Sequence, residues 1–206
     1  MQNGHLEPQL HSVALSALRP TQITVGYHEV ARKRQQWNES ENRDRPGFLG
    51  RHMIPVVIGP KGRLWLIDHH HLALALHEEG VEQVLVSVVA HLGHLQPAAF
   101  LTFMDNRNWL HPFDEKGRRQ GYDALPRRLG KLVDDPYRSL AGAVRRAGGY
   151  AKVDTPYSEF LWADFLRGRI KRSRLDARLD DCIAKALALA KSGDARHLPG
   201  WAGIAG

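Results

Sequence analysis

The sequence predicts an α+β protein in which a mixed domain comes first and a mostly helical half follows. Residues 53–58 and 63–67 are β-rich and flank a Gly-Pro-Lys-Gly turn, which is typical of a β-hairpin. Residues 84–89 give a second clear β signal. After Gln96 the pattern changes to apolar helical segments separated by glycine, proline and charge.

This change of pattern sets the expected domain organisation. We place a boundary near residue 95, with residues 1–95 as the α+β domain and residues 96–206 as a helical extension packed on it. A chain of 206 residues with 43% hydrophobic content is large enough for one substantial core and a smaller extension.

The elements before the hairpin are short. Residues 12–25 contain extended stretches around Leu18-Arg19-Pro20-Thr21-Gln22, and we expect a helix over residues 27–37. The polar residues 38–45 predict a loop.

The elements after the hairpin are one strand and several helices. Apolar residues occupy both parities of residues 84–89, so that strand is expected to be buried on both faces. Proline follows Asp135 and Thr155, which favours helix starts at both places. The expected helices cover residues 97–106, 136–146, 156–167 and 175–191.

Composition restricts the classes of partner and location. The formal net charge of +7 favours anionic partners such as nucleic acid or nucleotides. Apolar runs are too short to span a bilayer and the first residues lack a signal-peptide pattern, so the expected location is cytoplasmic. Cys182 is the single cysteine, which excludes a disulfide within the chain, and its helical setting predicts a buried or half-buried, unreactive side chain.

Basic residues are densest in residues 167–174. Solvated helix ends explain most such clusters, but this one is nearly uncompensated and is our candidate for binding a nucleic-acid backbone. The residues concerned are Arg167, Arg169, Lys171, Arg172 and Arg174.

The strongest local signal is Asp68-His69-His70-His71 at the junction of a strand and a helix. Leu72, Ala73, Ala75 and Leu76 supply a buried stripe, and Gly80 follows where a left-handed C-terminal cap is expected. The first turn of a helix presents backbone N–H groups and partial positive charge, so residues 69–71 predict a phosphate site. Asp68 either caps the helix or helps to position a Mg²⁺-bound nucleotide, and His70 and His71 are expected to contact the ligand directly.

A stable zinc or iron site is the weaker alternative at this place. Three consecutive helical residues diverge by about 100° each, so one ion could not easily bind all three imidazoles. The one-turn His spacing of zinc proteases is missing, although His70 with His77 and His91 with His94 are possible pairs. The identity of any metal ligand is left open.

Taken together, several separated motifs resemble the ParB/sulfiredoxin superfamily, and within it the ParB-like nucleases. The resemblance runs from about Leu18 to Gly200. It rests on Leu18-Arg19-Pro20-Thr21-Gln22, Gly26-Tyr27-His28-Glu29-Val30, Asp68-His69-His70-His71, Asp135-Pro136-Tyr137-Arg138-Ser139-Leu140 and Trp162-Ala163-Asp164-Phe165-Leu166-Arg167. It implies a ParB/sulfiredoxin-like fold for the N-terminal domain.

The resemblance also implies site residues, with two departures. The pattern Asp-Gly-His-His-Arg of serine kinases of this fold places His69 where glycine is expected and Leu72 where arginine is expected, and the Gly-Glu-Arg-Arg motif of partition proteins is absent. Those kinases use an early helical glutamate, which makes Glu29 a candidate general base. The corner has no cysteine, so sulfiredoxin chemistry is not expected.

Two further cations are candidates for phosphate or nucleotide binding. Lys33 stands four residues after Glu29, and that spacing also fits an ordinary exposed helical ion pair. Arg138 could clamp phosphate beside the Gly148-Gly149 break, while Tyr137 and Leu140 are expected to enter the core.

The leading hypothesis is a ParB-like protein that binds nucleotide or nucleic-acid phosphate at the histidine corner, with Mg²⁺-dependent nuclease or NTPase activity and ATP, ADP or CTP as candidate nucleotides. A non-enzymatic DNA-binding or partition-like nucleotide switch is the first alternative. A small-metabolite kinase is the second.

Overall fold

The predicted hairpin is present and lies inside a five-stranded sheet. The computed structural model gives the strand order β1-β6-β4-β5-β2. β4 pairs antiparallel with β5 and parallel with β6, β1 pairs antiparallel with β6, and β2 pairs parallel with β5. The strands are β1 (Leu10–Ala14), β2 (Leu18–Pro20), β4 (Ile54–Ile58), β5 (Leu64–Leu66) and β6 (Gln83–His91).

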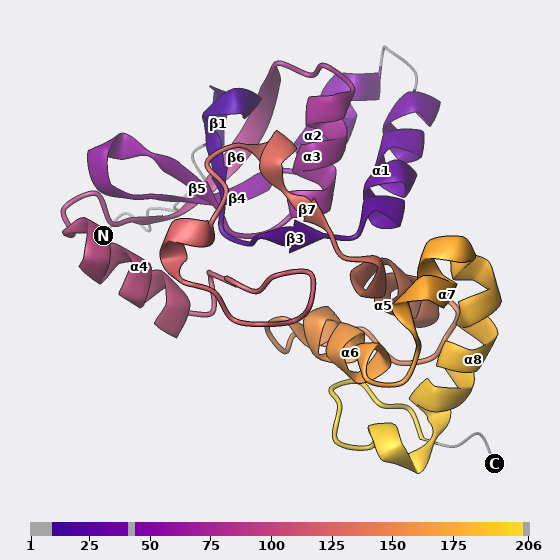
Figure 1. Cartoon of the computed structure of the whole chain (residues 1–206). Coiled ribbons are helices and arrows are strands. Elements are labelled where there is room, and N and C mark those ends of the chain that lie inside the picture. Colours follow the sequence, from indigo (N-terminus) through magenta and orange to yellow (C-terminus); the bar gives the residue numbers. More distant parts are fainter. Residues whose placement is uncertain (1–9, 41–43, 204–206) are drawn as a thin grey trace, which may run out of the picture. The chain divides into compact units, whose positions relative to one another are not determined.

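The structure describes residues 10–40 and 44–203, and the chain divides into two compact units. Unit 1 comprises Met1–Ile23, Val30–Pro112 and Arg119–Leu132. Unit 2 comprises Thr24–Glu29, Phe113–Arg118 and Val133–Gly206. The sheet lies in unit 1 (Figure 1).

Helices surround the sheet in unit 1. They are α2 (Arg45–Arg51), α3 (His70–Glu78), α4 (Pro97–Asn106) and all but the first residues of α1 (Tyr27–Glu39). Leu72, Leu74 and Leu76 of α3 are almost fully buried, and Gly80 has the expected left-handed backbone after the helix. Short 3-10 turns are η1 (Leu15–Ala17), η3 (Pro60–Gly62), η4 (Tyr122–Ala124) and η5 (Leu129–Lys131).

A second apolar cluster of unit 1 holds α4 against the hairpin. Phe100 and Met104 of α4 are buried with Val57 of β4, and Trp65 of β5 packs on the same cluster. Because α4 is bound to the sheet in this way, unit 1 continues well past residue 95.

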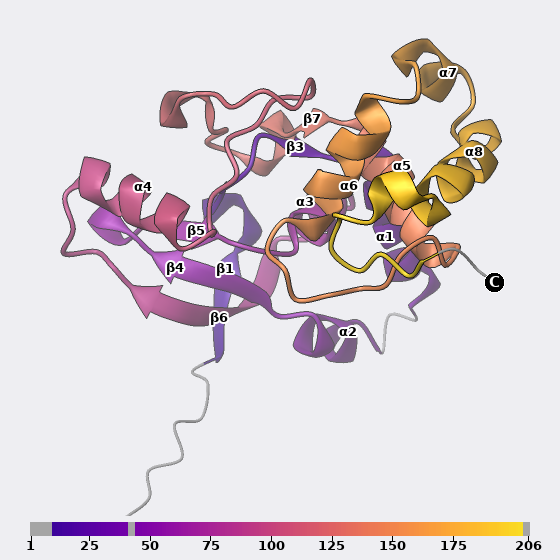
Figure 2. The same ribbon diagram turned by 90° about the horizontal axis from the view of Figure 1, so that it is seen from below.

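Unit 2 is a short parallel ribbon with a group of helices. β3 (Thr24–Val25) pairs with β7 (Val133–Asp134), as both views show (Figure 2). The helices are α5 (Pro136–Arg146), α6 (Ser158–Arg167), α7 (Arg172–Ala177) and α8 (Leu179–Lys191), followed by η6 (Gly193–Ala195). Leu140, Trp162, Leu166 and the free Cys182 are buried in one core.

The α+β class is confirmed, and so are most predicted elements. The helices expected at 97–106 and 136–146 have those bounds, and the helix expected at 27–37 continues to Glu39. The aromatic density of α6 serves packing, since Trp162 stacks on Tyr150 with the ring centroids 4.2 Å apart.

Four local predictions are wrong. The expected loop 38–45 ends in α2, which sequence reasoning missed; its residues 41–43 lie outside the described part. α6 begins at Ser158 after a left-handed Tyr157, so Thr155 does not cap it. The helix expected at 175–191 is interrupted by the extended backbone of Arg178. In β6 only Val84 and Val86 are buried, while Val89 is 47% exposed, so the strand has one open end.

Candidate functional site: the histidine corner and the charged ends of α1, α5 and α6

The histidine corner is a left-handed turn between β5 and α3. His69 has φ 65° and ψ 26°, a conformation that costs an ordinary L-residue about 1 kcal/mol or more and that glycine adopts freely. The resemblance expects glycine at this position, and the backbone geometry explains why. Capping of α3 was one of two roles expected for Asp68, but the N-cap residue is His69. The Asp68 carboxylate instead accepts the His69 backbone N–H at 2.6 Å.

His70 connects the corner to the strand beside it. Its side chain is buried, and Nε2 accepts the backbone N–H of Thr21 at 3.1 Å. The Thr21 hydroxyl lies 3.3 Å from the same nitrogen and donates to the Leu66 carbonyl at 2.8 Å. Because Nε2 accepts a hydrogen bond, the imidazole carries its proton on Nδ1 when neutral. Direct ligand contact by His70 remains a prediction, and the geometry shown is that of a positioning residue.

His69 is held in a partly buried, cationic environment. Burial lowers the pKa of His69 below its ordinary value, Asp68 acts in the opposite direction, and Lys33 and His52 lower it further. Its Nδ1 is buried, with no hydrogen-bond partner among the residues described. The neutral form of the His69 ring is therefore favoured at neutral pH.

Asp68 and His71 are the members of the corner that face outward. Asp68 is exposed and His71 is half-buried in the first turn of α3. Within residues 10–40 and 44–203 no group of three or more His, Cys, Asp or Glu side chains could hold a metal ion.

The start of α1 is bound to the start of α5 within unit 2. Gly26 lies so close to Ser139 that an added Cβ would meet its backbone nitrogen at 2.6 Å, so only glycine fits. The Tyr27 N–H donates to the Asp134 carboxylate at 2.7 Å, and the His28 N–H donates to the Ser139 hydroxyl at 3.2 Å. Two motifs of the resemblance thus lie side by side, and together they satisfy the first donors of α1.

Glu29 belongs to this junction and is not a surface residue. Its side chain is buried, one oxygen accepts from Arg146 Nη1 at 2.6 Å, and it covers the face of α5 at Gly142. The alternative interpretation places Glu29 on an exposed helix surface, paired with Lys33. Glu29 is buried, so that exposed setting is wrong. Catalysis by Glu29 and nucleotide binding by Lys33 remain predictions.

Arg138 lies in a second buried ion pair on the same side of α5. Its Nη2 donates to Glu159 at 2.9 Å, Arg145 lies 3.2 Å from the other Glu159 oxygen, and the guanidinium stacks over Phe160. Burial raises the pKa of Glu159, but Arg138 and Arg145 more than offset this and hold it below its ordinary value. Arg138 is thus fixed by a counterion in the structure, and phosphate binding by it remains a prediction.

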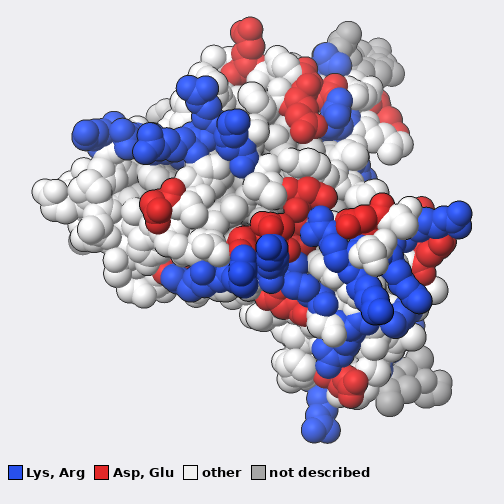
Figure 3. All heavy atoms as spheres, viewed as in Figure 1, with Lys and Arg blue, Asp and Glu red and all other residues white. Residues whose placement is uncertain are grey.

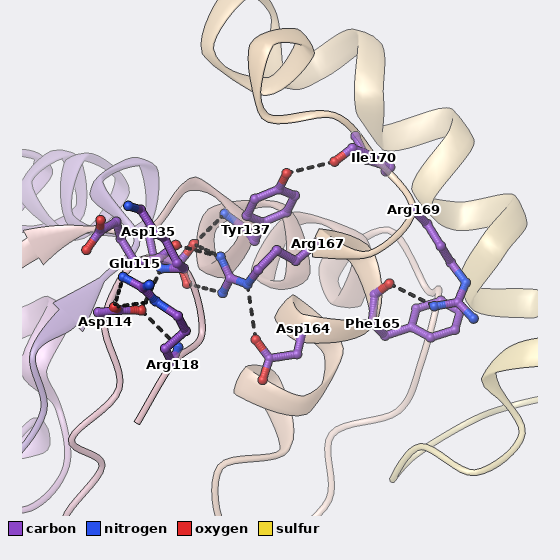
Figure 4. Close-up of polar contacts among 11 residues, drawn as sticks. Asp114, Glu115, Arg118, Asp135, Tyr137, Asp164, Phe165, Arg167, Arg169 and Ile170 are labelled. Atoms are coloured by element: carbon purple, nitrogen blue, oxygen red, sulfur yellow. Dashed lines mark hydrogen bonds and ion pairs between the residues drawn. The ribbon is translucent and has the colours of Figure 1, made fainter. Parts of the chain in front are cut away.

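Arg167 is tied to the N-terminus of α5 (Figure 4). Asp135 caps α5 by accepting the Tyr137 N–H at 3.0 Å and also accepts from two Arg167 nitrogens at 2.8 and 3.2 Å. Arg167 further donates to the Glu115 carbonyl at 2.7 Å and pairs with Asp164. Burial of the Arg167 guanidinium lowers its pKa, but the hydrogen bonds and charge of Asp135 more than offset this and raise it above its ordinary value.

The other cations of the 167–174 segment have different surroundings. Arg169 is exposed, stacks over Phe165 and donates to its carbonyl at 3.1 Å. Arg172 pairs with Asp176 at 2.7 Å. Lys171 and Arg174 are exposed, with no ion pair among the described residues. Nucleic-acid contact by this segment remains a prediction, and the charge free for it is smaller than the sequence indicates.

Several residues of these arrangements were not predicted. Thr21, Asp134, Arg146 and Glu159 each contact a predicted residue that lies far away in sequence. Thr21 and Asp134 stand in or next to the quoted motifs, which was the available signal. Nothing in the local sequence marks Glu159 as the counterion of Arg138.

Comparisons with known proteins agree with this arrangement. A model of the family described as Putative ParB-like nuclease matches residues 11–168. The crystal structure of protein Atu1540 from Agrobacterium tumefaciens is 55% identical in sequence, covers 97% of this chain and 100% of its own, and superposes with a TM-score of 0.91. No curated protein matches the sequence. No helix in the described residues is long and apolar enough to cross a membrane.

Proposed function

Since the chain belongs to the ParB-like nuclease family, whose name points to a nucleic-acid-related function, we propose that it hydrolyses a phosphodiester bound at the histidine corner. The observation that carries this proposal is the left-handed turn at His69. Backbone strain at a non-glycine residue is often kept where it holds functional groups in place. Here it holds an exposed carboxylate and the start of a helix at one point.

Each member of the corner has a role in the proposal. The N-terminus of α3 favours the negative charge of a phosphoryl group, and the side chain of its N-cap residue His69 makes no capping hydrogen bond there. Asp68 keeps its second carboxylate oxygen for a cation or a water molecule, because Oδ1 accepts from His69. His71, in the first turn, is the proton donor to the leaving oxygen. His70 positions the corner through Thr21.

The donor set fits Mg²⁺ as an ion shared with the substrate. Asp68 would hold it, and when bound it would polarise the phosphoryl oxygens. The same chemistry would serve ATP, ADP or CTP, so NTPase activity is the variant of this proposal in which the phosphate belongs to a free nucleotide. The positive net charge of the chain supports the polynucleotide form.

The test compares matched histidine and carboxylate variants of the full chain. With Mg²⁺ present, nicking of supercoiled DNA and release of phosphate from nucleotides are measured for the unaltered protein, Asp68→Asn, His71→Ala and His77→Ala. His77 is the control, because it is exposed at the other end of α3. We expect turnover to fall at least about 100-fold in the first two variants and to persist in the control.

The possible outcomes separate the candidate functions. Equal turnover in all four proteins would remove the corner from the reaction. Tight DNA or nucleotide binding without turnover would favour the non-enzymatic switch. Nucleotide consumption that requires a hydroxyl acceptor would favour the metabolite kinase.

A further inference from the structure

A group of cations in the described part of unit 1 has no acidic partner. Arg34, Arg119 and Arg145 each pair with a carboxylate. Arg19, Arg63 and Arg127 have no ion pair within the described residues. We call these three residues the cationic strip. A cluster of positive charges without acidic partners favours the binding of a polyanion.

The sheet brings the strip together from three separate segments. Arg19 in β2 stands opposite Trp65 in the parallel β2–β5 register, and its guanidinium lies 5.6 Å from the centre of the Trp65 ring. Arg63 directly precedes β5, and η5, which follows Arg127 and Arg128, packs against β2. Burial lowers the pKa of Arg19, and the nearby charges of Arg63 and Arg127 lower it further.

The strip is accessible from outside. Arg63 and Arg127 are exposed and Arg19 is half-buried. Their cationic neighbours Lys61 and Arg128 are also exposed. Figure 3 shows a band of Lys and Arg atoms over the part of unit 1 that holds β5 in Figure 1, with few acidic atoms in it. In unit 2, by contrast, Asp and Glu atoms are mixed with the basic ones in the same view (Figure 3).

The strip also continues toward the histidine corner along one strand direction. Thr21 follows the last residue of β2 and lies two residues after Arg19, which is about 7 Å along an extended chain. Thr21 donates its backbone N–H to His70. If a linear polyanion is bound along the strip, a neighbouring phosphate group would therefore reach the histidine corner.

We propose that Arg19, Arg63 and Arg127 form the surface of this protein that binds the phosphodiester backbone of a nucleic acid and leads it to the histidine corner. This rests on the proposed function, since it names how the same substrate is held. It moves the binding surface away from residues 167–174. Contact is to phosphates, and phosphate contacts carry no direct sequence information.

The experiment measures binding of labelled nucleic acid by fluorescence anisotropy over a range of NaCl concentrations. The probes are a duplex DNA, a single-stranded DNA and a single-stranded RNA of equal length. The strip variant carries Arg19→Gln, Arg63→Gln and Arg127→Gln, and the matched control, which loses the same charge, carries Arg169→Gln, Lys171→Gln and Arg174→Gln. Circular dichroism checks that both variants fold.

For the probe that binds best we expect the slope of log affinity against log salt to fall by about 3 in the strip variant and to stay unchanged in the control. Affinity of the strip variant at low salt should be at least about 10-fold weaker. The best-bound probe identifies whether the backbone is that of DNA or RNA.

Four results would overturn the inference. Equal losses in both variants would mean that only net charge matters, and a loss confined to the control would place contact at residues 169–174. Binding of anionic lipid vesicles or of polyglutamate, with none of any nucleic acid, would assign the strip to another polyanion. If corner-dependent nicking is observed while the strip variant binds normally, the inference fails and the proposed function stands.

Discussion

Replacement of Arg167 distinguishes a structural arginine from a nucleic-acid contact. Asp135 is 1% exposed and receives two hydrogen bonds from Arg167, whose side chain is 18% exposed. Removing one partner of a buried pair costs about 3–5 kcal/mol, because the other charge stays buried without compensation. Since Arg167 is partly solvated and Asp135 keeps the Tyr137 N–H, we expect Arg167→Ala to lower the stability of unit 2 by about 3 kcal/mol.

The measurement is native-state hydrogen exchange of the α5 and α6 amides, with urea unfolding as a second reading. Arg174→Ala is the control, since Arg174 is exposed and its replacement should change stability by less than about 0.5 kcal/mol. Asp135→Asn keeps an acceptor for Tyr137 but removes the charge, so it should also lower stability, and the double variant should lose less than the sum of the two.

The salt dependence of DNA binding supplies the opposite reading. A phosphate contact would lower the salt slope by about 1 without loss of exchange protection. If Arg167→Ala gave that result, our reasoning about the Asp135 pair would be refuted and the original assignment of Arg167 to nucleic acid restored.

Three other changes test separate parts of the structure. Burial raises the pKa of Glu159, but Arg138 more than offsets this and holds it below its ordinary value of 4.5. The ion pair therefore stabilises the protein fully above pH 4.5, and this stabilisation is lost as the pH falls through the lower pKa of the folded state. Glu159→Gln should flatten the acid limb of a stability–pH curve, and an unchanged limb would contradict this. Gly149→Ala would push a Cβ onto Val144, including its carbonyl at 3.0 Å, and should lower the urea midpoint by the equivalent of about 1–3 kcal/mol; a midpoint equal to that of the unaltered protein would show that the α5 end adjusts freely. His69→Gly relieves the left-handed strain and should not lower the thermal midpoint. His69→Ala keeps the strain, so its thermal midpoint should be lower than that of His69→Gly; the reverse order would argue against strain at the corner.

The sequence predicts the fold class and most elements because hydrophobic period, proline and glycine are local signals. The hairpin, α4 and α5 follow from such signals and have the expected bounds or nearly so. The break at Arg178 has no glycine or proline to mark it, and only the packing of α7 and α8 reveals it. The start of α6 was missed because tyrosine rarely adopts a left-handed backbone, and nothing in the local sequence indicates that Tyr157 does so; the same holds for His69.

The candidate site was only partly predictable, because its charges take partners from distant segments. Asp68, His69 and His71 lie at a strand-to-helix corner as expected. The partner of His70 is 49 residues away and that of Glu29 is 117 residues away, and no periodicity encodes either contact. Charge density indicated residues 167–174, but the number of arginines in a segment does not reveal that Asp135 neutralises Arg167.

The parallel register of β2 and β5 also restricts how the length of this chain can change in evolution. Arg19 faces Trp65 and, two residues on, Thr21 reaches His70. One residue inserted or deleted between them would turn Arg19 or Thr21 to the opposite face of the sheet. Relatives that keep this arrangement should therefore vary in length at the η3 turn of the hairpin, where Gly62 has open space around it, and hold the spacing from Arg19 to Thr21 constant.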